Sequence, residues 1–406
     1  MKERTLVLVV AGVQFVNVLD FVMVMPLGPD FASGLGIATS HIGIVGGSYT
    51  AAAAVAGLAG ATFLDRFDRR KALTVAMLGL VVGTVLGGFA TGLASLLFAR
   101  VLAGAFGGPA TALSLAIVSD VVPPERRGRA MGVVMTAFSV ASTLGVPVGL
   151  ELARLFGWRA PFFAVGALAL VFTVIAFRLL PSLTGHLARD PSPSRDGRLF
   201  DRLTALTLLN TALVMGSVFA IVPNISAFLQ HNLGYPRDRL GLLYLVGGIA
   251  SFLATRLVGT LVDRFGATKL VAFGTLLYGC ALYFGFVHEL DVHHVIYVFT
   301  LLMVSASLRG VPLNTLATRV PHRSQRARFM SAQSAVQHLS SSAGALVTSL
   351  WLDAEPSGKL VGMASVSLTA IGFALFVPVL SFIIERAVKR REAERAAPAV
   401  PIPVVG

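Results

Sequence analysis

The segment AGATFLDRFDRRKAL (residues 59–73) has a second, weaker copy in LVGTLVDRFGATKL (residues 257–270), about 198 positions further along the chain. The same offset, or one residue less, relates Leu35-Gly36 to Leu233-Gly234, Gly43 to Gly241, Lys71 to Lys269, Pro123 to Pro321, Pro26 to Pro223, and Phe31 to Phe228. Because this offset holds over most of the chain, it predicts two duplicated halves.

The composition around these copies is that of an integral membrane protein. Of the 406 residues, 55% are hydrophobic and 13% are charged, against about 25% charged residues in soluble domains. About twelve apolar stretches are long enough to cross a bilayer core of about 30 Å as helices. Their approximate limits are 5–29, 41–63, 72–91, 94–118, 130–152, 160–180, 204–229, 240–262, 269–288, 294–317, 329–351 and 360–384. The sequence therefore predicts an all-α integral membrane fold of twelve transmembrane helices in two pseudo-symmetric six-helix bundles.

The polar segments divide the chain. Residues 1–180 form the expected first bundle and residues 204–385 the second, joined by a linker (181–203) rich in Pro, Asp and Arg. Most of the 33 Lys and Arg residues lie in the termini and alternate loops, which places both termini in the cytoplasm. The basic tail, 386–406, is expected to contact anionic membrane lipids and not nucleic acid. The first apolar stretch is too long for a cleavable signal peptide.

Several classes of chemistry lack their residues. The single cysteine, Cys280, excludes an internal disulfide and a cysteine metal site. No G-x-x-x-x-G-K-[ST] phosphate loop is present, so the chain does not hydrolyse ATP. No nucleophile constellation stands out, and His288, His293 and His294 lack the carboxylate spacing of a catalytic zinc site. We therefore expect no enzyme activity, no cofactor and no metal.

The duplicated segments also carry a family resemblance. The run from Asp65 to Lys71 resembles the signature between helices 2 and 3 of the major facilitator superfamily, and residues 263–269 resemble its second copy. Arg100, followed by Gly104, is similar to the Arg-x-x-x-Gly signature of helix 4. Two positions depart from the first signature, because Ala61 and Asp68 stand where it has glycine.

The resemblance becomes narrower in helices 1 and 5. Leu19-Asp20, followed by Met25-Pro-Leu-Gly28, resembles helix 1 of the twelve-helix drug:proton antiporters and related sugar-efflux permeases. Gly145, Pro147 and Gly149 form a reduced version of the helix 5 motif found in antiporters of the superfamily. The resemblance implies a multi-pass protein of the cell inner membrane, working as a monomer.

Asp20 is the first candidate for coupling transport to protons. It lies among Val, Phe and Met within an expected span, where an ionised carboxylate is costly unless it is paired, protonated or hydrated. The antiparallel sense of helices 1 and 4 places Arg100 at a similar depth. We expect a switchable Asp20–Arg100 ion pair, in which proton and substrate compete for one site. The alternative is a purely structural salt bridge.

The second group of candidates concerns the gate. The resemblance implies that Asp65 accepts hydrogen bonds from the start of helix 11, near Phe329, and that Asp263 does the same at helix 5. The accompanying basic residues are Arg66, Arg69, Arg70 and Arg264. The alternative for these arginines is the ordinary positive charge of cytoplasmic loops. Gly145, Pro147 and Gly149 predict a kink or a tight seal between helices 5 and 8, or ordinary helix packing.

Polar stripes indicate the substrate cavity, which the resemblance places between helices 1, 4, 7 and 10. Asn210, Ser217 and Asn224 recur every seven residues, and Gln333 and Gln337 are one helical turn apart. Further candidates are Gln14, Asn17, Phe21, Arg309 and Asn314. For Arg309, an anion-binding role and a role in capping backbone carbonyls both remain open. The polar groups are alternatively glue between helices.

These observations favour proton-coupled efflux of small amphipathic or drug-like molecules by alternating access. The partners are then a small-molecule substrate, protons and membrane lipids. A specific exporter or exchanger of a metabolite such as a sugar is the second hypothesis. A membrane sensor or lipid-handling protein on the same fold is the third.

Overall fold

The computed structural model describes residues 3–184, 201–288, 291–321 and 326–396, without the side chains of 61–63, 65, 124–125, 263, 326–327 and 395–396. The helices of the first half are α1 (Glu3–Val24), α2 (Gly28–Leu35), α3 (Ile42–Phe63), α4 (Arg69–Gly88), α5 (Leu93–Val121), α6 (Pro124–Val140), α7 (Val146–Phe156) and α8 (Ala160–Leu179). Those of the second half are α9 (Arg202–Ile221), α10 (Ile225–Ala227), α11 (Leu240–Phe265), α12 (Ala267–Leu282), α13 (Val295–Arg319), α14 (Arg326–Trp351) and α15 (Met363–Ala396).

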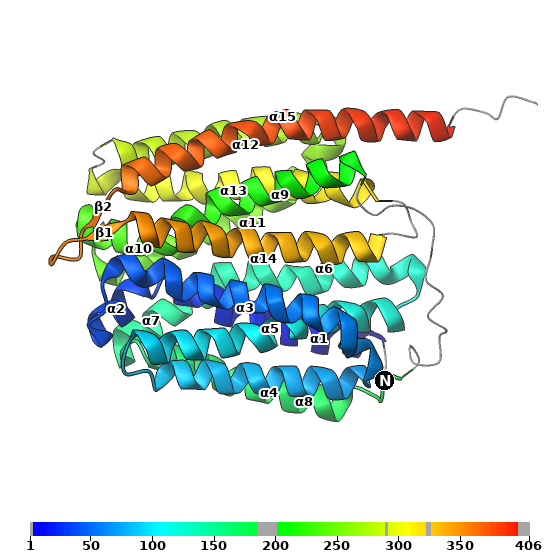
Figure 1. Cartoon of the computed structure of the whole chain (residues 1–406), viewed down its shortest axis with the longest axis horizontal. Helices are drawn as coiled ribbons and strands as arrows, with labels where there is room; N and C mark the ends of the chain where they lie inside the picture. The colour runs from blue at the N-terminus through cyan, green and yellow to red at the C-terminus, as the bar shows by residue number, and fades with distance from the viewer. Residues whose placement is uncertain (1–2, 185–200, 289–290, 322–325, 397–406) are drawn as a thin grey trace, which may run out of the picture.

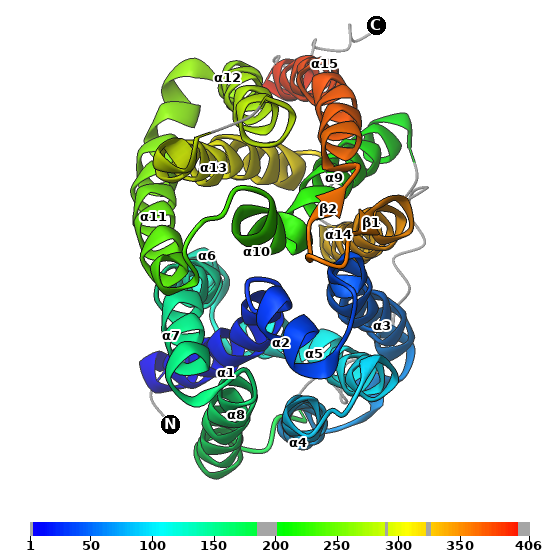
Figure 2. The same cartoon turned by 90° about the vertical axis from the view of Figure 1, so that its left-hand side faces the viewer.

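The long helices run side by side along one axis (Figure 1). Viewed along that axis, α1–α8 gather in one bundle and α9–α15 in the other, with α3 beside α14 and α7 beside α11 between them (Figure 2). The two ends of the molecule differ. One end, called the linker end, holds Glu3, the start of the linker and the end of α15.

The opposite end, called the hairpin end, carries the only strands in the part of the chain that the structure describes. Strands β1 (Asp353–Ala354) and β2 (Leu360–Val361) pair antiparallel, with Asp353 opposite Val361. The turn between them closes at Gly358, whose φ of 84° is a left-handed conformation suited to glycine. The all-α prediction included no strand, because a hairpin of two-residue strands has too few residues to show an alternating pattern.

Eleven helical stretches among the described residues are long and apolar enough to cross a membrane. The remaining long helix is α14, whose 26 residues include Gln333, Gln337, His338 and several serines. It is long enough to span but is too polar to be recognised by hydropathy. Together these segments occupy the twelve predicted stretches, and the all-α membrane fold is confirmed.

Prolines break three of the expected spans. Helix α1 ends at Val24 and not near residue 29, because Pro26 and Pro29 cannot continue it and Pro29 instead sits in the first turn of α2. A π-helical turn, η3 (Ala141–Gly145), separates α6 from α7 just before Pro147. Since proline has no N–H to donate, the ladder shifts register there. Pro223 likewise ends α9, which is followed by the short turns η4 (Val222–Asn224) and η5 (Phe228–Asn232).

The two halves are joined by several contacts toward the hairpin end. The Thr39 hydroxyl donates to the Gly358 carbonyl at 3.0 Å, and the Ser342 hydroxyl donates to the Gly47 carbonyl at 3.0 Å. A Cβ on Gly43 would lie 2.6 Å from the Ala345 oxygen, so glycine lets α3 and α14 approach closely.

At this end an ion pair also crosses between the halves. Arg237 donates from Nε and Nη2 to the two carboxylate oxygens of Asp30, at 2.7 and 2.8 Å. The same guanidinium donates from Nη2 to the Leu150 carbonyl at 3.1 Å. We call the Asp30–Arg237 pair the clasp.

Candidate functional site

Asp20 and Arg100 meet inside the first bundle. Nη1 of Arg100 lies 3.1 Å from Oδ2 and 3.2 Å from Oδ1 of Asp20, and Nη2 donates to the Asp20 carbonyl at 3.3 Å. The Thr84 hydroxyl donates to Oδ1 at 2.7 Å. The side chains are 1% and 0% exposed, so the carboxylate has protein partners in place of water. The two predicted coupling residues are therefore in contact, and their role in coupling stays a prediction.

Glycines bring the surrounding helices close enough to enclose this pair. A Cβ on Gly104 would lie 2.2 Å from the Tyr49 carbonyl oxygen, and one on Gly83 would lie 2.5 Å from the Ala103 nitrogen. Helix α5 can therefore lie against the backbones of α3 and α4. The Tyr49 ring then covers the Arg100 guanidinium, whose central carbon is 4.6 Å from the ring centroid.

The other cavity candidates of helix α1 have different environments. The Asn17 amide donates to the Gly107 carbonyl at 2.9 Å and to the Thr111 hydroxyl, and accepts from the Tyr49 hydroxyl at 3.0 Å. Its hydrogen bonds therefore hold the first bundle together. Gln14 is buried, and its Oε1 has no hydrogen-bond partner among the described residues.

Phe21, three residues before the end of α1, links the two halves. Its ring stacks on Tyr49 at a centroid distance of 5.3 Å and on Phe219 of α9 at 5.9 Å. An apolar aromatic contact of this kind between the bundles suits a surface that separates and reforms, because no buried polar partner is left behind.

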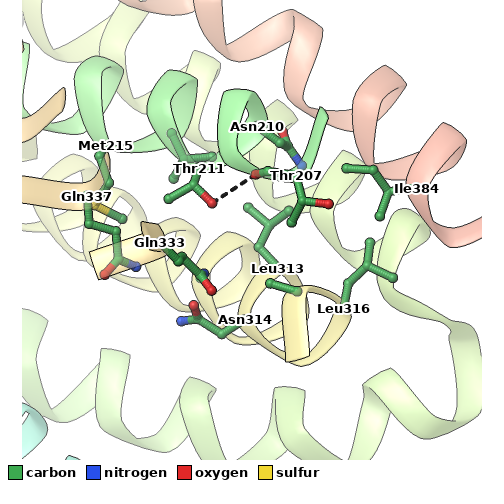
Figure 3. A pocket seen from close by; sticks show the side chains of 13 residues that line it. Thr207, Asn210, Thr211, Met215, Leu313, Asn314, Leu316, Gln333, Gln337 and Ile384 are labelled. Atoms are coloured by element: carbon green, nitrogen blue, oxygen red, sulfur yellow. Dashed lines mark hydrogen bonds between the residues drawn. The ribbon is translucent and has the colours of Figure 1, made fainter. Parts of the chain in front are cut away.

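A pocket lies within the second bundle, between α9, α13, α14 and α15 (Figure 3). Four predicted cavity residues line it: Asn210, Asn314, Gln333 and Gln337. The full lining is Thr207, Asn210, Thr211, Val214, Met215, Gly310, Leu313, Asn314, Leu316, Ala317, Gln333, Gln337 and Ile384. Thr207 and Thr211 were not predicted. With Asn210 and Val214 they follow the i, i+3, i+4, i+7 pattern of one helix face, which could have identified them.

Two of these amides have unused hydrogen-bonding capacity. Nδ2 of Asn210 donates to the Ser381 hydroxyl at 3.1 Å, whereas its Oδ1 has no partner among the described residues. Oε1 of Gln333 is also without a partner in that part of the chain. Buried amide oxygens without partners are costly, so a ligand that donates hydrogen bonds would stabilise this pocket.

The remaining candidates of the second bundle lie outside the pocket lining. The Ser217 hydroxyl donates to the Val214 carbonyl at 2.9 Å and lies 3.4 Å from Nη2 of Arg309. Asn224 is 0% exposed, and neither atom of its amide has a partner among the described residues. The turn at Pro223 removes it from the regular face that Asn210 and Ser217 share.

The gate candidates are seen only in part. The side chains of Asp65 and Asp263 lie outside the described residues. Arg69 pairs with Asp120 of its own half at 3.3 Å, and Arg70 donates to the Leu180 carbonyl at 3.3 Å.

Two further arginines of the gate group stay near the surface. Arg66 is exposed, and the Arg264 guanidinium lies 5.4 Å from the centre of the neighbouring Phe265 ring. The gating role of all six charged residues remains a prediction.

Asp68, which replaces a glycine of the signature, has a well-defined structural role. Its carboxylate accepts from the Arg70 N–H at 2.8 Å, which caps α4, and from the Leu183 N–H and Ser182 hydroxyl at the start of the linker. Partial burial alone would raise the pKa of Asp68, but these hydrogen bonds outweigh it and lower the pKa. In the sequence, Asp68 was recognisable only as a departure from the signature, and its hydrogen bonds to α4 and to the linker were not predicted.

The glycines of the helix 5 motif face helix α1 within their own bundle. A Cβ on Gly145 would lie 2.4 Å from Cδ1 of Leu19, whereas one on Gly149 would lie 3.8 Å from Met23. The close approach between the halves uses a glycine of α11 instead, since a Cβ on Gly248 would lie 2.8 Å from the Thr143 Cα. The Thr143 hydroxyl also donates to the Gly248 carbonyl at 3.2 Å.

Comparison with known sequences shows that one family profile matches nearly the whole chain. The sequence profile of the Major Facilitator Superfamily matches residues 10–205 and 207–405. A chloramphenicol resistance protein of Streptomyces lividans is 26% identical over 335 residues, which cover 81% of this chain and 84% of that protein. The uncharacterized MFS-type transporter YceJ of Bacillus subtilis (strain 168) is 26% identical over 276 residues, 67% of this chain and 70% of that protein.

Solved structures of similar fold include two transporters. A bacterial homologue of the human lysosomal transporter Spinster, in an inward-facing and occupied conformation, superposes with a TM-score of 0.70 at 16% identity and covers 97% of this chain and 98% of that one. The human organic anion transporter MFSD10 (TETRAN) gives a TM-score of 0.66 at 21% identity over 94% of this chain and 100% of that one.

Proposed function

This chain belongs to the Major Facilitator Superfamily, whose members are transporters and not enzymes, and from that premise we propose that it is a proton-coupled exporter of small amphipathic molecules. Transport works by alternating access, in which the two bundles rock against each other and expose the substrate site to each side of the membrane in turn. The protein lies in the cell inner membrane with both termini in the cytoplasm, and the linker end is the cytoplasmic end.

The observation that carries the proton coupling is the isolation of Asp20. Among the twelve expected spans, Asp20 and Glu151 are the only acidic residues. Glu151 lies near the end of its span, where it is exposed and pairs with Arg154. Asp20 is fully buried and holds Arg100, so a proton that binds its carboxylate must break or weaken a specific ion pair. Protonation of Asp20 releases Arg100, and this event drives the exchange between states.

The pocket supports a substrate that is partly polar and partly apolar. Amide and hydroxyl groups face it alongside Val214, Met215 and Leu313. Such a lining suits a small molecule with hydrogen-bonding groups on an apolar body. The name of the Streptomyces relative, a chloramphenicol resistance protein, supports a drug-like substrate and export as the direction.

Purified protein in liposomes tests this proposal. We expect a pH gradient to drive accumulation of radiolabelled chloramphenicol by the wild type, with proton movement followed by an internal dye. Asp20→Asn should lose gradient-driven accumulation while it still exchanges labelled for unlabelled solute. The control is Glu151→Gln, the other acidic residue in a span, which should behave like the wild type. Full gradient-driven accumulation by Asp20→Asn would refute the role of this carboxylate.

A metabolite exporter is the second candidate, and the amide-rich pocket favours it. Asn210, Asn314, Gln333 and Gln337 are side chains suited to the hydroxyl groups of a sugar. Competition separates the candidates: inhibition of chloramphenicol exchange by sugars, but not by other drug-like molecules, would assign the protein to this class.

A further inference from the structure

Arg309 of α13 is a buried cation without a counter-charge. Its side chain is among the largest fully buried ones, with 1% exposure, and no ion pair to it occurs among the described residues. Its Nε and Nη1 have no hydrogen-bond partner there, and Nη2 makes a long contact to the Ser217 hydroxyl, while the guanidinium also interacts with the Tyr278 side chain. The six expected spans of the second half contain no Asp or Glu. The protein itself therefore offers this guanidinium no carboxylate within the membrane.

The first bundle has a comparable contact between an arginine and a tyrosine, with a counter-charge present. At an offset of 197 residues, the position of Asp20 corresponds to Ser217. Arg100 lies over the ring of Tyr49 at 4.6 Å, and Arg309 lies over the ring of Tyr278 at 4.2 Å. Each bundle thus holds an arginine against a tyrosine, although the tyrosines lie on α3 and α12, which do not correspond in the repeat. Only the first bundle supplies a carboxylate to its arginine.

A buried cation that keeps two unused donors is costly, and membrane helices retain such residues where they bind something. The Ser217 hydroxyl donates to the Val214 carbonyl and the Tyr278 hydroxyl to the Ser217 carbonyl, both at 2.9 Å, so the unused donors are those of Arg309. We propose that the Arg309 guanidinium, positioned by Ser217 and Tyr278, binds a carboxylate carried by the transported molecule. Guanidinium binds carboxylates strongly because both groups are planar and can share parallel hydrogen bonds. This inference rests on the proposed function, and it adds amphipathic molecules with an acidic group to the substrates expected there.

The site adjoins the pocket. Gly310 and Leu313, which line the pocket, follow Arg309 by one residue and by one helical turn. A Cβ on Gly310 would meet nothing within 4 Å, so the pocket has open space at the residue that follows Arg309. On the facing helix, Val214 lines the pocket and its carbonyl accepts the Ser217 hydroxyl. A molecule whose body lies against Asn314 and Gln333 would direct its acidic end toward Arg309.

The test replaces the missing carboxylate. Ser217→Asp gives Arg309 the partner that Asp20 gives Arg100, whereas Ser217→Asn is a neutral control of the same size. Binding is measured on purified protein in detergent, by thermal unfolding against benzoate and its neutral counterpart benzamide. We expect benzoate, and not benzamide, to stabilise the wild type and Ser217→Asn. In Ser217→Asp and Arg309→Gln the affinity for benzoate should fall about 10- to 100-fold, the loss of one charge-assisted hydrogen bond.

Three results would overturn the inference. Benzoate fails to stabilise the wild type, or stabilises Ser217→Asp and Arg309→Gln as well as it does the wild type. Alternatively, chloride stabilises the protein as well as benzoate does, which would assign the site to an inorganic anion and not to the substrate. Ser217→Asp adds a counter-charge, so it keeps the test valid should Arg309→Gln fail to fold.

The outcome is separable from that of the proposed function. Benzoate binding is measured without a membrane or a gradient, and Asp20→Asn should retain it. Loss of proton coupling in Asp20→Asn without any benzoate binding to the wild type would leave the exporter standing and remove the anion site. The reverse combination would leave the anion site standing and remove proton coupling by Asp20.

Discussion

Removal of the clasp should shift the protein toward a state that is open at the hairpin end. The clasp joins α2 to the turn before α11, and so joins the two halves. Asp30→Asn keeps the shape of the side chain and one acceptor oxygen, but it removes the charge and the two-pronged ion pair. The bond from Arg237 to the Leu150 carbonyl remains available.

The geometry sets the size of the effect. The side chains of Arg237 and Asp30 are 23% and 21% exposed, so the pair lies between two limits. Exposed pairs contribute about 0.2–1 kcal/mol, whereas removal of one partner of a buried pair costs about 3–5 kcal/mol. We expect Asp30→Asn to destabilise the closed hairpin end by about 1–2 kcal/mol, a factor of about 5–30 in the ratio of closed to open molecules.

Distance measurement between spin labels reports this ratio. Labels on Ser33→Cys and Ser357→Cys, both exposed and one in each half, are introduced into a Cys280→Ser background. Electron–electron resonance should then show a larger fraction of long distances in Asp30→Asn. The control is Arg159→Gln, because Arg159 donates to the Ala90 carbonyl within its own half. An unchanged distance distribution in Asp30→Asn would show that the clasp does not hold this end closed.

Two further predictions concern stability. Gly104→Ala should destabilise the protein by about 1–3 kcal/mol in thermal unfolding, because its Cβ would lie 2.2 Å from the Tyr49 carbonyl oxygen. The control is Gly132→Ala, where a Cβ meets nothing within 4 Å, and it should be neutral or slightly stabilising. Equal effects of the two substitutions would refute the packing argument. Asp68→Ala should accelerate hydrogen exchange at the Leu183 amide at neutral pH. The folded-state pKa of Asp68 is lowered, so its carboxylate stays ionised above the ordinary Asp pKa of about 4. The wild type should therefore keep the Leu183 amide protected from exchange above that pH and lose the protection only as the pH falls through the lowered pKa. Protection that fades at neutral pH would contradict the hydrogen bond from Leu183 to Asp68.

The sequence predicted features that depend on composition and period. The constant offset revealed two halves, because duplicated helices keep their spacing. Asp20 and Arg100 were expected to meet, because two opposite charges at similar depth in lipid have few other partners. The helical period grouped Gln333 with Gln337 on α14, and both line the pocket, whereas of the predicted stripe on α9 only Asn210 does.

Features that depend on contacts between distant segments were not predictable. The carboxylate of Asp68 holds Leu183, which is 115 positions away and in a different loop. The amide of Asn17 was expected in the cavity, but whether it faces a ligand or a neighbouring helix depends on how closely α5 approaches. That approach is set by glycines, whose effect on packing appears only when both helices are placed. The register shift at η3 needed the structure for the same reason, since proline permits a kink or a π turn equally.

The polarity of α14 bears on how the protein is made. A helix with two glutamines, a histidine and several serines does not partition into lipid as readily as its eleven neighbours do. It is covered by α9 of its own half and by α3 of the other, which is synthesised first. We therefore expect α14 to be held in the membrane by packing against these two helices more than by partition into lipid. Assembly of the second half would then draw on a surface of the first, although the sequence offset predicts that the two halves are copies of one unit.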